Sequence, residues 1–306
     1  MRNIFVKITL AVIYLFSLFP LKVHYFFSGI IRFILKDILK YRYSTIVTNL
    51  SRSFPELKYN DIKKLTDRYY VYMCDLFAET LWDYGHSRNA LRKRLSVEGE
   101  DIITEAQKSV GRVMIVLGHC GNCEYVGAFI GACSDKDKDG FSRNPVYTIY
   151  KAAENKFFDR IVKAMRESDY KKFKMEGSLL ESNEVARHTL THKEEQSVYM
   201  LIADQNPTGP HPQVVTFLNQ PTMMLRGPEF LSAKNKMAVV YMYMDRIGRG
   251  KFKCSCELIT LNAANEEPGF VTKRFAELLE RDINSNRINW LWSHKRWKRD
   301  IPTNQQ

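Results

Sequence analysis

The sequence predicts an α/β protein with a mixed central sheet flanked by helices and an N-terminal membrane-anchoring helix. Two observations predict the α/β part. From about residue 95 onward, short apolar runs of strand length alternate with segments of helical character, and a long amphipathic segment precedes them. The anchor is predicted by an apolar run from Ile4 to about Leu21. We therefore expect an anchor in residues 1–42 and one α/β domain in residues 43–306.

The N-terminal apolar run is interrupted only by Lys7 and Ser17, and it is nearly long enough to cross a bilayer, which takes roughly 20 apolar residues. A cleaved signal peptide would end at small residues, whereas Pro20 and the residues after it lead into another bulky apolar stretch. A retained anchor is therefore the preferred interpretation, and a buried core helix is the alternative. Basic residues flank these segments and place the main body on the cytoplasmic side: Arg2, Lys36, Lys40 and Arg42.

The next elements follow from apolar periodicity. Asn60 or Asp61 can cap a helix that reaches about Trp82, because apolar residues recur there at helical spacing. Strands are predicted at residues 112–117, 146–150, 197–203, 237–244 and 251–261, and a final helix at residues 271–286. Ligand sites of such sheets lie beyond the carboxyl ends of the strands, so we expect the chemistry there.

Composition narrows the possible classes of function and partner but does not identify one. The chain has 306 residues, 45% of them hydrophobic, which is enough for a large core. A formal net charge of +12 favours an anionic partner, which can be a nucleic acid, an acidic protein or a phospholipid surface. Six cysteines are too few for a disulfide scaffold in a chain of this length, so we expect reduced thiols.

One histidine stands where the sheet should carry its chemistry. His119 follows the strand at residues 112–117, Gly118 permits a tight exit, and Asn122 can cap a helix with Glu124 in its first turn. We expect Glu124 to reach back to the imidazole and support it as a general base, while amides of the first helical turn bind an oxyanion. By spacing alone this pair is weak evidence, and a structural role is equally compatible.

The segment His119-Cys-Gly-Asn-Cys-Glu124 resembles the histidine, four residues, acid motif of glycerolipid acyltransferases. Its glutamate form resembles that of the lipid A biosynthesis acyltransferases, the late or secondary enzymes of lipopolysaccharide assembly, in the lysophospholipid-acyltransferase-like superfamily. Further blocks resemble that family in the same order, at residues 49–57, 150–155 with Asp159, Arg160 and Arg166, 204–207, 216–218, 226–228 and 291–297.

The resemblance implies a membrane-bound enzyme of the bacterial inner membrane. Such an enzyme transfers an acyl chain from acyl carrier protein to a hydroxyl of a lipid A precursor, commonly the 3-hydroxyl of an attached hydroxyacyl chain. His119 would remove the hydroxyl proton and Glu124 would support the imidazolium. No metal or cofactor is expected besides the acyl carrier protein donor, and no nucleic acid partner.

Four further residues are predicted to bind substrate: Asn122, Arg166, Asp204 and Gln205. The Arg166 guanidinium can donate two parallel hydrogen bonds to phosphate oxygens or stabilise an oxyanion. The alternative is that Arg166 is an ordinary surface residue. Asp204 and Gln205 follow a strand and can hold an acceptor hydroxyl or position Arg166, although a simple strand end is compatible too.

Several alternatives remain open. Cys120 and Cys123 stand where a thioredoxin-like dithiol would, and with Cys254 and Cys256 they can make a zinc site. The closing segment of tryptophans and basic residues suits a membrane interface better than a nucleic acid, and plain packing also explains the tryptophans. Other functions to separate are an acyltransferase for another lysolipid or glycolipid and a non-enzymatic membrane lipid-binding protein.

Overall fold

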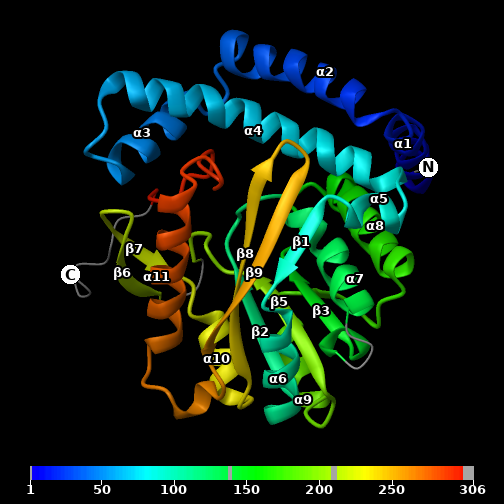
Figure 1. Cartoon of the computed structure of the whole chain (residues 1–306), viewed down its shortest axis with the longest axis vertical. Coiled ribbons are helices and arrows are strands. Elements are labelled where there is room, and N and C mark those ends of the chain that lie inside the picture. Colours follow the sequence, from blue (N-terminus) through cyan, green and yellow to red (C-terminus); the bar gives the residue numbers. More distant parts are fainter. Residues whose placement is uncertain (1, 137–139, 208–211, 299–306) are drawn as a thin grey trace.

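A seven-stranded sheet flanked by helices forms the centre of the molecule (Figure 1). The computed structural model describes residues 2–136, 140–207 and 212–298. The strands are β1 (Leu95–Glu98), β2 (Arg112–Leu117), β3 (Val146–Tyr150), β4 (Gly177–Glu181), β5 (Ser197–Ile202), β6 (Gln213–Phe217), β7 (Gln220–Met224), β8 (Ala238–Gly248) and β9 (Lys251–Thr260). The central order is β1-β9-β8-β2-β5-β3-β4, and β6 and β7 form a separate hairpin.

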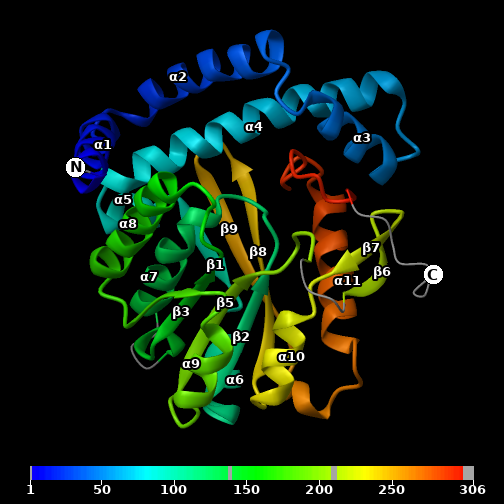
Figure 2. The same cartoon turned by 180° about the vertical axis from the view of Figure 1, so that it is seen from behind.

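Helices surround the sheet on both faces and across one end. They are α1 (Arg2–Ser17), α2 (Leu21–Phe33), the π-helix η1 (Ile34–Ile38), α3 (Tyr43–Ser53), α4 (Tyr59–Gly85), α5 (Arg88–Arg92), α6 (Glu100–Val110), α7 (Val126–Lys136), α8 (Lys156–Phe173), α9 (Val185–Thr191), α10 (Gly227–Lys234) and α11 (Phe270–Ser285), with single 3₁₀ turns η2 (Cys123–Tyr125), η3 (Phe141–Arg143) and η4 (Ala263–Asn265). Figure 2 shows α4 lying across one end of the sheet with α2 on its far side.

The predicted mixed sheet is confirmed. All neighbouring strands of the central sheet are parallel except β8 and β9, which are antiparallel. The strands at residues 112–117 and 146–150 have the predicted bounds, and α4 and α11 lie within a few residues of theirs. Parallel strands of this kind are buried on both faces, which explains their nearly continuous apolar sequence.

Alternation along β2 shows how the core is divided. Met114 and Val116 face the cluster packed by α10, α11 and the C-terminal segment, while Val113, Ile115 and Leu117 face the cluster packed by α6 and α7. All five side chains are at most 3% exposed. The end of β2 is therefore packed on both sides, and this packing fixes the point at which the following loop begins.

The N-terminal apolar run is not one helix. α1 and α2 meet at an angle of 114° at a break formed by residues 18–20. Pro20 lacks a backbone N–H and disfavours helical backbone at the residue before it, so the chain cannot continue α1 into α2. In the described part of the chain no single helix has the length and hydropathy to cross a membrane, and by these criteria only the bent pair Ile4–Ser17 and Leu21–Ile38 can. The predicted single anchor helix is corrected to this bent pair.

A buried ion-pair cluster holds α2 and α4 to the β8–β9 turn. Asp75 on α4 is 1% exposed and accepts hydrogen bonds from Ser28 of α2 at 2.7 Å, from Arg246 at 3.0 Å and from Arg249 at 2.7 and 2.8 Å. Because these donors come from α2 and from the β8–β9 turn, the Asp75 carboxylate fixes the N-terminal helices against the domain, together with Glu79, which accepts from Arg246 at 2.8 Å and from Tyr25 of α2 at 2.9 Å.

We predict that Asp75→Asn lowers the free energy of unfolding by about 3 kcal/mol, because two guanidinium groups then lose a buried anionic partner. Urea unfolding of the detergent-solubilised chain measures the change. Asp67→Asn is the matched control, since Asp67 also joins the N-terminal segment to α4, through Lys36 at 2.7 Å, but is 41% exposed. The control should lose at most about 1 kcal/mol. Equal losses in the two variants would contradict the prediction.

Candidate active site

The register of β2 and β5 brings His119 and Asp204 together. Leu117 and Ile202, the last residues of these parallel strands, are paired partners, and each functional residue lies two positions beyond its strand. His119 Nδ1 lies 2.5 Å from Asp204 Oδ1, and the His119 backbone N–H donates to Oδ2 at 2.8 Å. The site therefore lies at the carboxyl ends of the central strands, as predicted.

Gly118 is needed for this approach. A Cβ at residue 118 would lie 2.6 Å from Leu279 Cδ1 of α11 and 3.3 Å from Asp204 Oδ2. The turn continues through Gly121, whose φ of 63° is in the left-handed region and whose N–H donates to the Asn289 side chain at 3.1 Å. The loop after β2 is thus packed against α11 and the C-terminal segment rather than free to move.

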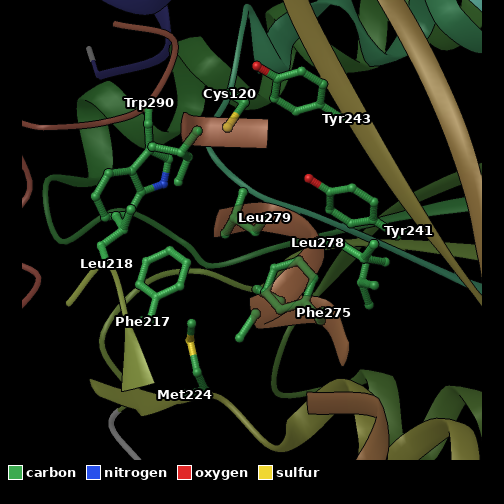
Figure 3. Packing of buried hydrophobic residues seen from close by; sticks show 14 of the residues in the cluster. Cys120, Phe217, Leu218, Met224, Tyr241, Tyr243, Phe275, Leu278, Leu279 and Trp290 are labelled. Carbon is green, nitrogen blue, oxygen red and sulfur yellow. The ribbon is translucent and has the colours of Figure 1, made fainter. Parts of the chain in front are cut away.

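Trp290 completes the surroundings of the carboxylate. Its indole Nε1 donates to Asp204 Oδ2 at 2.7 Å, and the ring packs beside Phe217 of the β6–β7 hairpin and Leu279 of α11 (Figure 3). Trp290 is 2% exposed and Trp292 is 0% exposed. The expectation that these two tryptophans form part of a membrane interface is therefore wrong, because both are core residues.

Asp204 is ionised despite being 2% exposed. Burial opposes the charge, but the His119 imidazole and backbone N–H and the Trp290 indole outweigh it and lower the pKa of Asp204 to about 2. A carboxylate against Nδ1 fixes the tautomer with the proton on Nδ1, which leaves Nε2 as the basic nitrogen. The Gln205 side-chain amide nitrogen lies 3.2 Å from Nε2 and donates to it in that tautomer.

Glu124 does not make the contact predicted for it. Both oxygens of its carboxylate bind Arg166 of α8, at 2.8 Å to Nε and 2.6 Å to Nη2. Among the described residues, the hydrogen bonds of the imidazole go to Asp204 and Gln205. The reason is geometric: η2 starts at Cys123 and directs Glu124 toward α8, whereas the end of β5 carries Asp204 directly beside His119. The expected pair of Glu124 and imidazole is thus corrected to Asp204 and imidazole.

Asn122 caps η2 as predicted, because its side-chain oxygen accepts from the Glu124 N–H at 3.2 Å. Asn122 is 3% exposed, and Thr80 of α4 also donates to the same oxygen at 3.2 Å. Its side chain is thereby occupied by protein groups and does not line the cavity beside His119. This geometry does not support the substrate-binding role predicted for Asn122.

A cavity of about 410 Å³ opens beside the imidazole. His119, Arg166 and Gln205 are in its wall, together with apolar residues of the strands and α7: Leu117, Val126, Ile149, Met200, Leu201 and Ile202. Hollows of about 490 and 630 Å³ lie at β1 and between α10 and α11, and neither has His119, Asp204 or Arg166 in its wall. The wall of the cavity at His119 combines basic and polar groups with apolar residues, as binding of an amphipathic molecule requires.

The thiols offer no support for redox or zinc chemistry. Burial raises the pKa of Cys120 and of Cys123, whereas dithiol exchange requires an accessible thiolate of lowered pKa. Among residues 2–136, 140–207 and 212–298, no group of three or more His, Cys, Asp or Glu side chains has the geometry of a metal site. Cys254 and Cys256 are buried along β9.

Comparison with known proteins gives a family. A family model described as "Bacterial lipid A biosynthesis acyltransferase" matches residues 1–299. No curated protein matches the chain.

The ionised Asp204 carboxylate makes a pH-dependent contribution to stability. Its pKa is about 2 in the folded protein and about 3.9 when unfolded, so its contribution is present above about pH 4 and is lost as pH falls toward 2. We expect the unfolding free energy of the wild type to fall by roughly 2 kcal/mol through this group over that interval. In Asp204→Asn this contribution is absent, so its unfolding free energy should fall less over the same interval. Urea unfolding at a series of pH values measures it. Exposed Asp101→Asn controls for the substitution, and identical pH curves for wild type and Asp204→Asn would contradict the assignment.

Proposed function

The chain belongs to the bacterial lipid A biosynthesis acyltransferase family, and we propose that it transfers a fatty acyl chain from acyl carrier protein to a hydroxyl of a lipid A precursor. The observation that carries the proposal is an imidazole held by a buried carboxylate in the wall of a cavity that is also lined by apolar residues. This arrangement supplies a general base and space for a hydrocarbon chain, and it needs no nucleophilic side chain.

His119 is the proposed general base. Nε2 accepts the proton of the acceptor hydroxyl as its oxygen attacks the thioester carbonyl, while Asp204 stabilises the imidazolium through Nδ1. The tetrahedral intermediate then breaks its carbon–sulfur bond, and the imidazolium returns the proton to the leaving thiolate. The products are an ester and the free thiol of the carrier. Gln205, 3.2 Å from Nε2, lies where it can bind the acceptor hydroxyl.

Arg166 is the proposed electrostatic partner of the reaction. Glu124 binds the guanidinium through Nε and Nη2 and so fixes the plane of the group in the cavity wall. Burial opposes the charge of Arg166, but Glu124 raises its pKa above the ordinary value, so the group stays cationic. A fixed cation here stabilises either the developing oxyanion or the phosphate of the donor's phosphopantetheine arm. Glu124 then acts as a positioning residue for Arg166.

Membrane attachment is proposed through α1 and α2. Their outward faces expose large apolar side chains over half or more of their surface, including Phe5, Leu15 and Phe26. The opposite faces pack on α4. An apolar face of this extent suits the acyl region of a bilayer, and a cytoplasmic orientation at the bacterial inner membrane gives access to an acidic carrier protein, which the net charge of +12 favours.

The first test is His119→Ala in the purified full chain with acyl carrier protein donor and lipid A precursor. We predict a fall in kcat of at least about 100-fold, because the general base is lost. His192→Ala is the matched control, because His192 is exposed and directly follows α9. This variant should retain wild-type turnover. Near-normal turnover of His119→Ala would refute the mechanism.

Assays of the purified wild-type chain separate the alternative functions. Transfer to another lysolipid or glycolipid but not to the lipid A precursor would indicate a different acceptor, and lipid binding without any transfer would indicate a non-enzymatic lipid-binding protein. Mass spectrometry of lipid A from a deletion strain and a complemented strain gives an independent answer, since one missing acyl mass identifies both the donor chain and the acceptor class.

A second test uses pairs of substitutions to locate the acid that serves the imidazole. If Glu124 acts through Arg166, Glu124→Gln and Arg166→Gln should lower kcat by similar factors, and the double variant should be little worse than either alone. Glu124→Gln combined with Asp204→Asn should instead multiply the two losses. The opposite pattern, with Glu124 coupled to Asp204 and independent of Arg166, would restore the direct pairing of Glu124 with His119.

A further inference from the structure

A second polar hollow lies between α3 and the C-terminal segment, and it is called the tail groove. Its volume is about 230 Å³. One wall is a stripe of α3 formed by Ser44, Thr45, Thr48 and Arg52, which recur at helical spacing and so share one face. The other wall is formed by the C-terminal residues Lys295, Trp297 and Lys298.

Asn49 fastens the two walls of the tail groove together. Its side-chain amide donates to the backbone carbonyls of Trp292 at 2.8 Å and of His294 at 2.9 Å. Trp297 is held separately, because its indole Nε1 donates to Thr222 of β7 at 2.7 Å. The groove is therefore a built feature with a fixed width rather than a chance gap beside a loose chain end.

The polar groups of the tail groove are unused within the described part of the chain. Arg52, Lys295 and Lys298 are exposed and form no ion pair with a described carboxylate, and the hydroxyls of Ser44, Thr45 and Thr48 make no hydrogen bond there. Among residues 2–136, 140–207 and 212–298, no acidic side chain lines the groove. Three cations and three hydroxyls thus present spare donors to one small volume, which is the donor set that binds phosphate oxygens.

A fourth cation, Arg296, lies between two groove residues in the chain and forms no ion pair with a described carboxylate. Arg296, between Lys295 and Trp297 in the chain, is 2% exposed and donates to the Met223 carbonyl at 2.6 Å, while its Nε has no partner among the described residues. Burial lowers the pKa of Arg296 to about 10, against the attraction of Asp204. A buried guanidinium without a carboxylate is unfavourable, and an anion bound nearby would offset that penalty.

We propose that the tail groove binds a phosphate on the sugar headgroup of the acceptor lipid. This rests on the proposed function, and it adds that the acceptor glycolipid carries a phosphate. One phosphate with part of a sugar fits a volume of about 230 Å³. The indole face of Trp297 offers an apolar surface for a sugar ring, and the hydroxyls of α3 add hydrogen bonds to the charge contacts.

The tail groove is connected to the base by direct contacts. Trp297 packs against Trp290 at a centroid distance of 6.0 Å, and Trp290 donates to the carboxylate that binds His119. A headgroup held in the groove is thereby placed at a fixed position relative to Nε2. Headgroup binding should then affect acceptor KM and leave the chemical step alone.

The kinetic test compares wild type with Lys295→Ala/Lys298→Ala in the full chain, using the phosphorylated acceptor and the same acceptor after phosphatase treatment. We expect acceptor KM to rise about 10-fold or more for the phosphorylated lipid with kcat within about twofold, and no change for the phosphate-free lipid. Lys108→Ala/Lys273→Ala, on exposed faces of α6 and α11, removes the same charge elsewhere and should behave as wild type. Equal KM in the two double variants, or equal losses for both lipids, would overturn the proposal.

A binding test separates the groove from the reaction. Calorimetry on the His119→Ala chain should show tighter binding of glucosamine 1-phosphate than of glucosamine. Adding Lys295→Ala/Lys298→Ala should remove this difference in affinity. Sugar phosphate binding by a wild-type chain that transfers no acyl group would uphold the groove and refute the proposed function, while transfer by a wild-type chain that binds no sugar phosphate would do the reverse. Loss of binding to phosphatidylglycerol vesicles alone, with acceptor KM unchanged, would assign these lysines to the bilayer and overturn the proposal.

Discussion

The site depends on one buried carboxylate that accepts three hydrogen bonds from separate parts of the chain. Asp204 follows β5, and its donors are the imidazole and backbone of His119 after β2 and the indole of Trp290 in the C-terminal segment. A charge that is 2% exposed is stable only while such donors remain in place. The same interaction that orients the base therefore fastens two strand ends and the C-terminal segment together, so catalytic geometry and folding share one constraint.

Much of this could be predicted from the sequence, and the exceptions have a physical cause. Apolar periodicity located the strands and α4, and Gly118 with Asn122 located the loop of His119. The carboxylate partner was misassigned because sequence spacing favours Glu124, five residues away, over Asp204, which is 85 residues away. Only the parallel pairing of Leu117 with Ile202 brings Asp204 close, and strand pairing is not encoded in local pattern.

The N-terminal segment shows a related limit of local pattern. Hydropathy predicted one nearly continuous apolar segment, but it did not predict the break at Pro20, which divides the segment into two helices at 114°. Nor could it show that Ser28, in the second apolar stretch, donates to a buried carboxylate of α4. Composition thus indicates a membrane-facing surface, whereas the hydrogen bonds determine that α2 is also a structural part of the domain.

The C-terminal segment connects the two ends of the proposed acceptor site. Within nine residues it provides Trp290 to the catalytic carboxylate and Lys295, Trp297 and Lys298 to the tail groove. Asn49 holds the segment at Trp292 and His294, and Thr222 holds it at Trp297. If a headgroup phosphate occupies the groove, the distance from the groove to Nε2 selects which acceptor hydroxyl can reach the base. The choice of hydroxyl then follows from rigid spacing along this segment, because Trp290 is packed in the core and cannot move without uncovering Asp204.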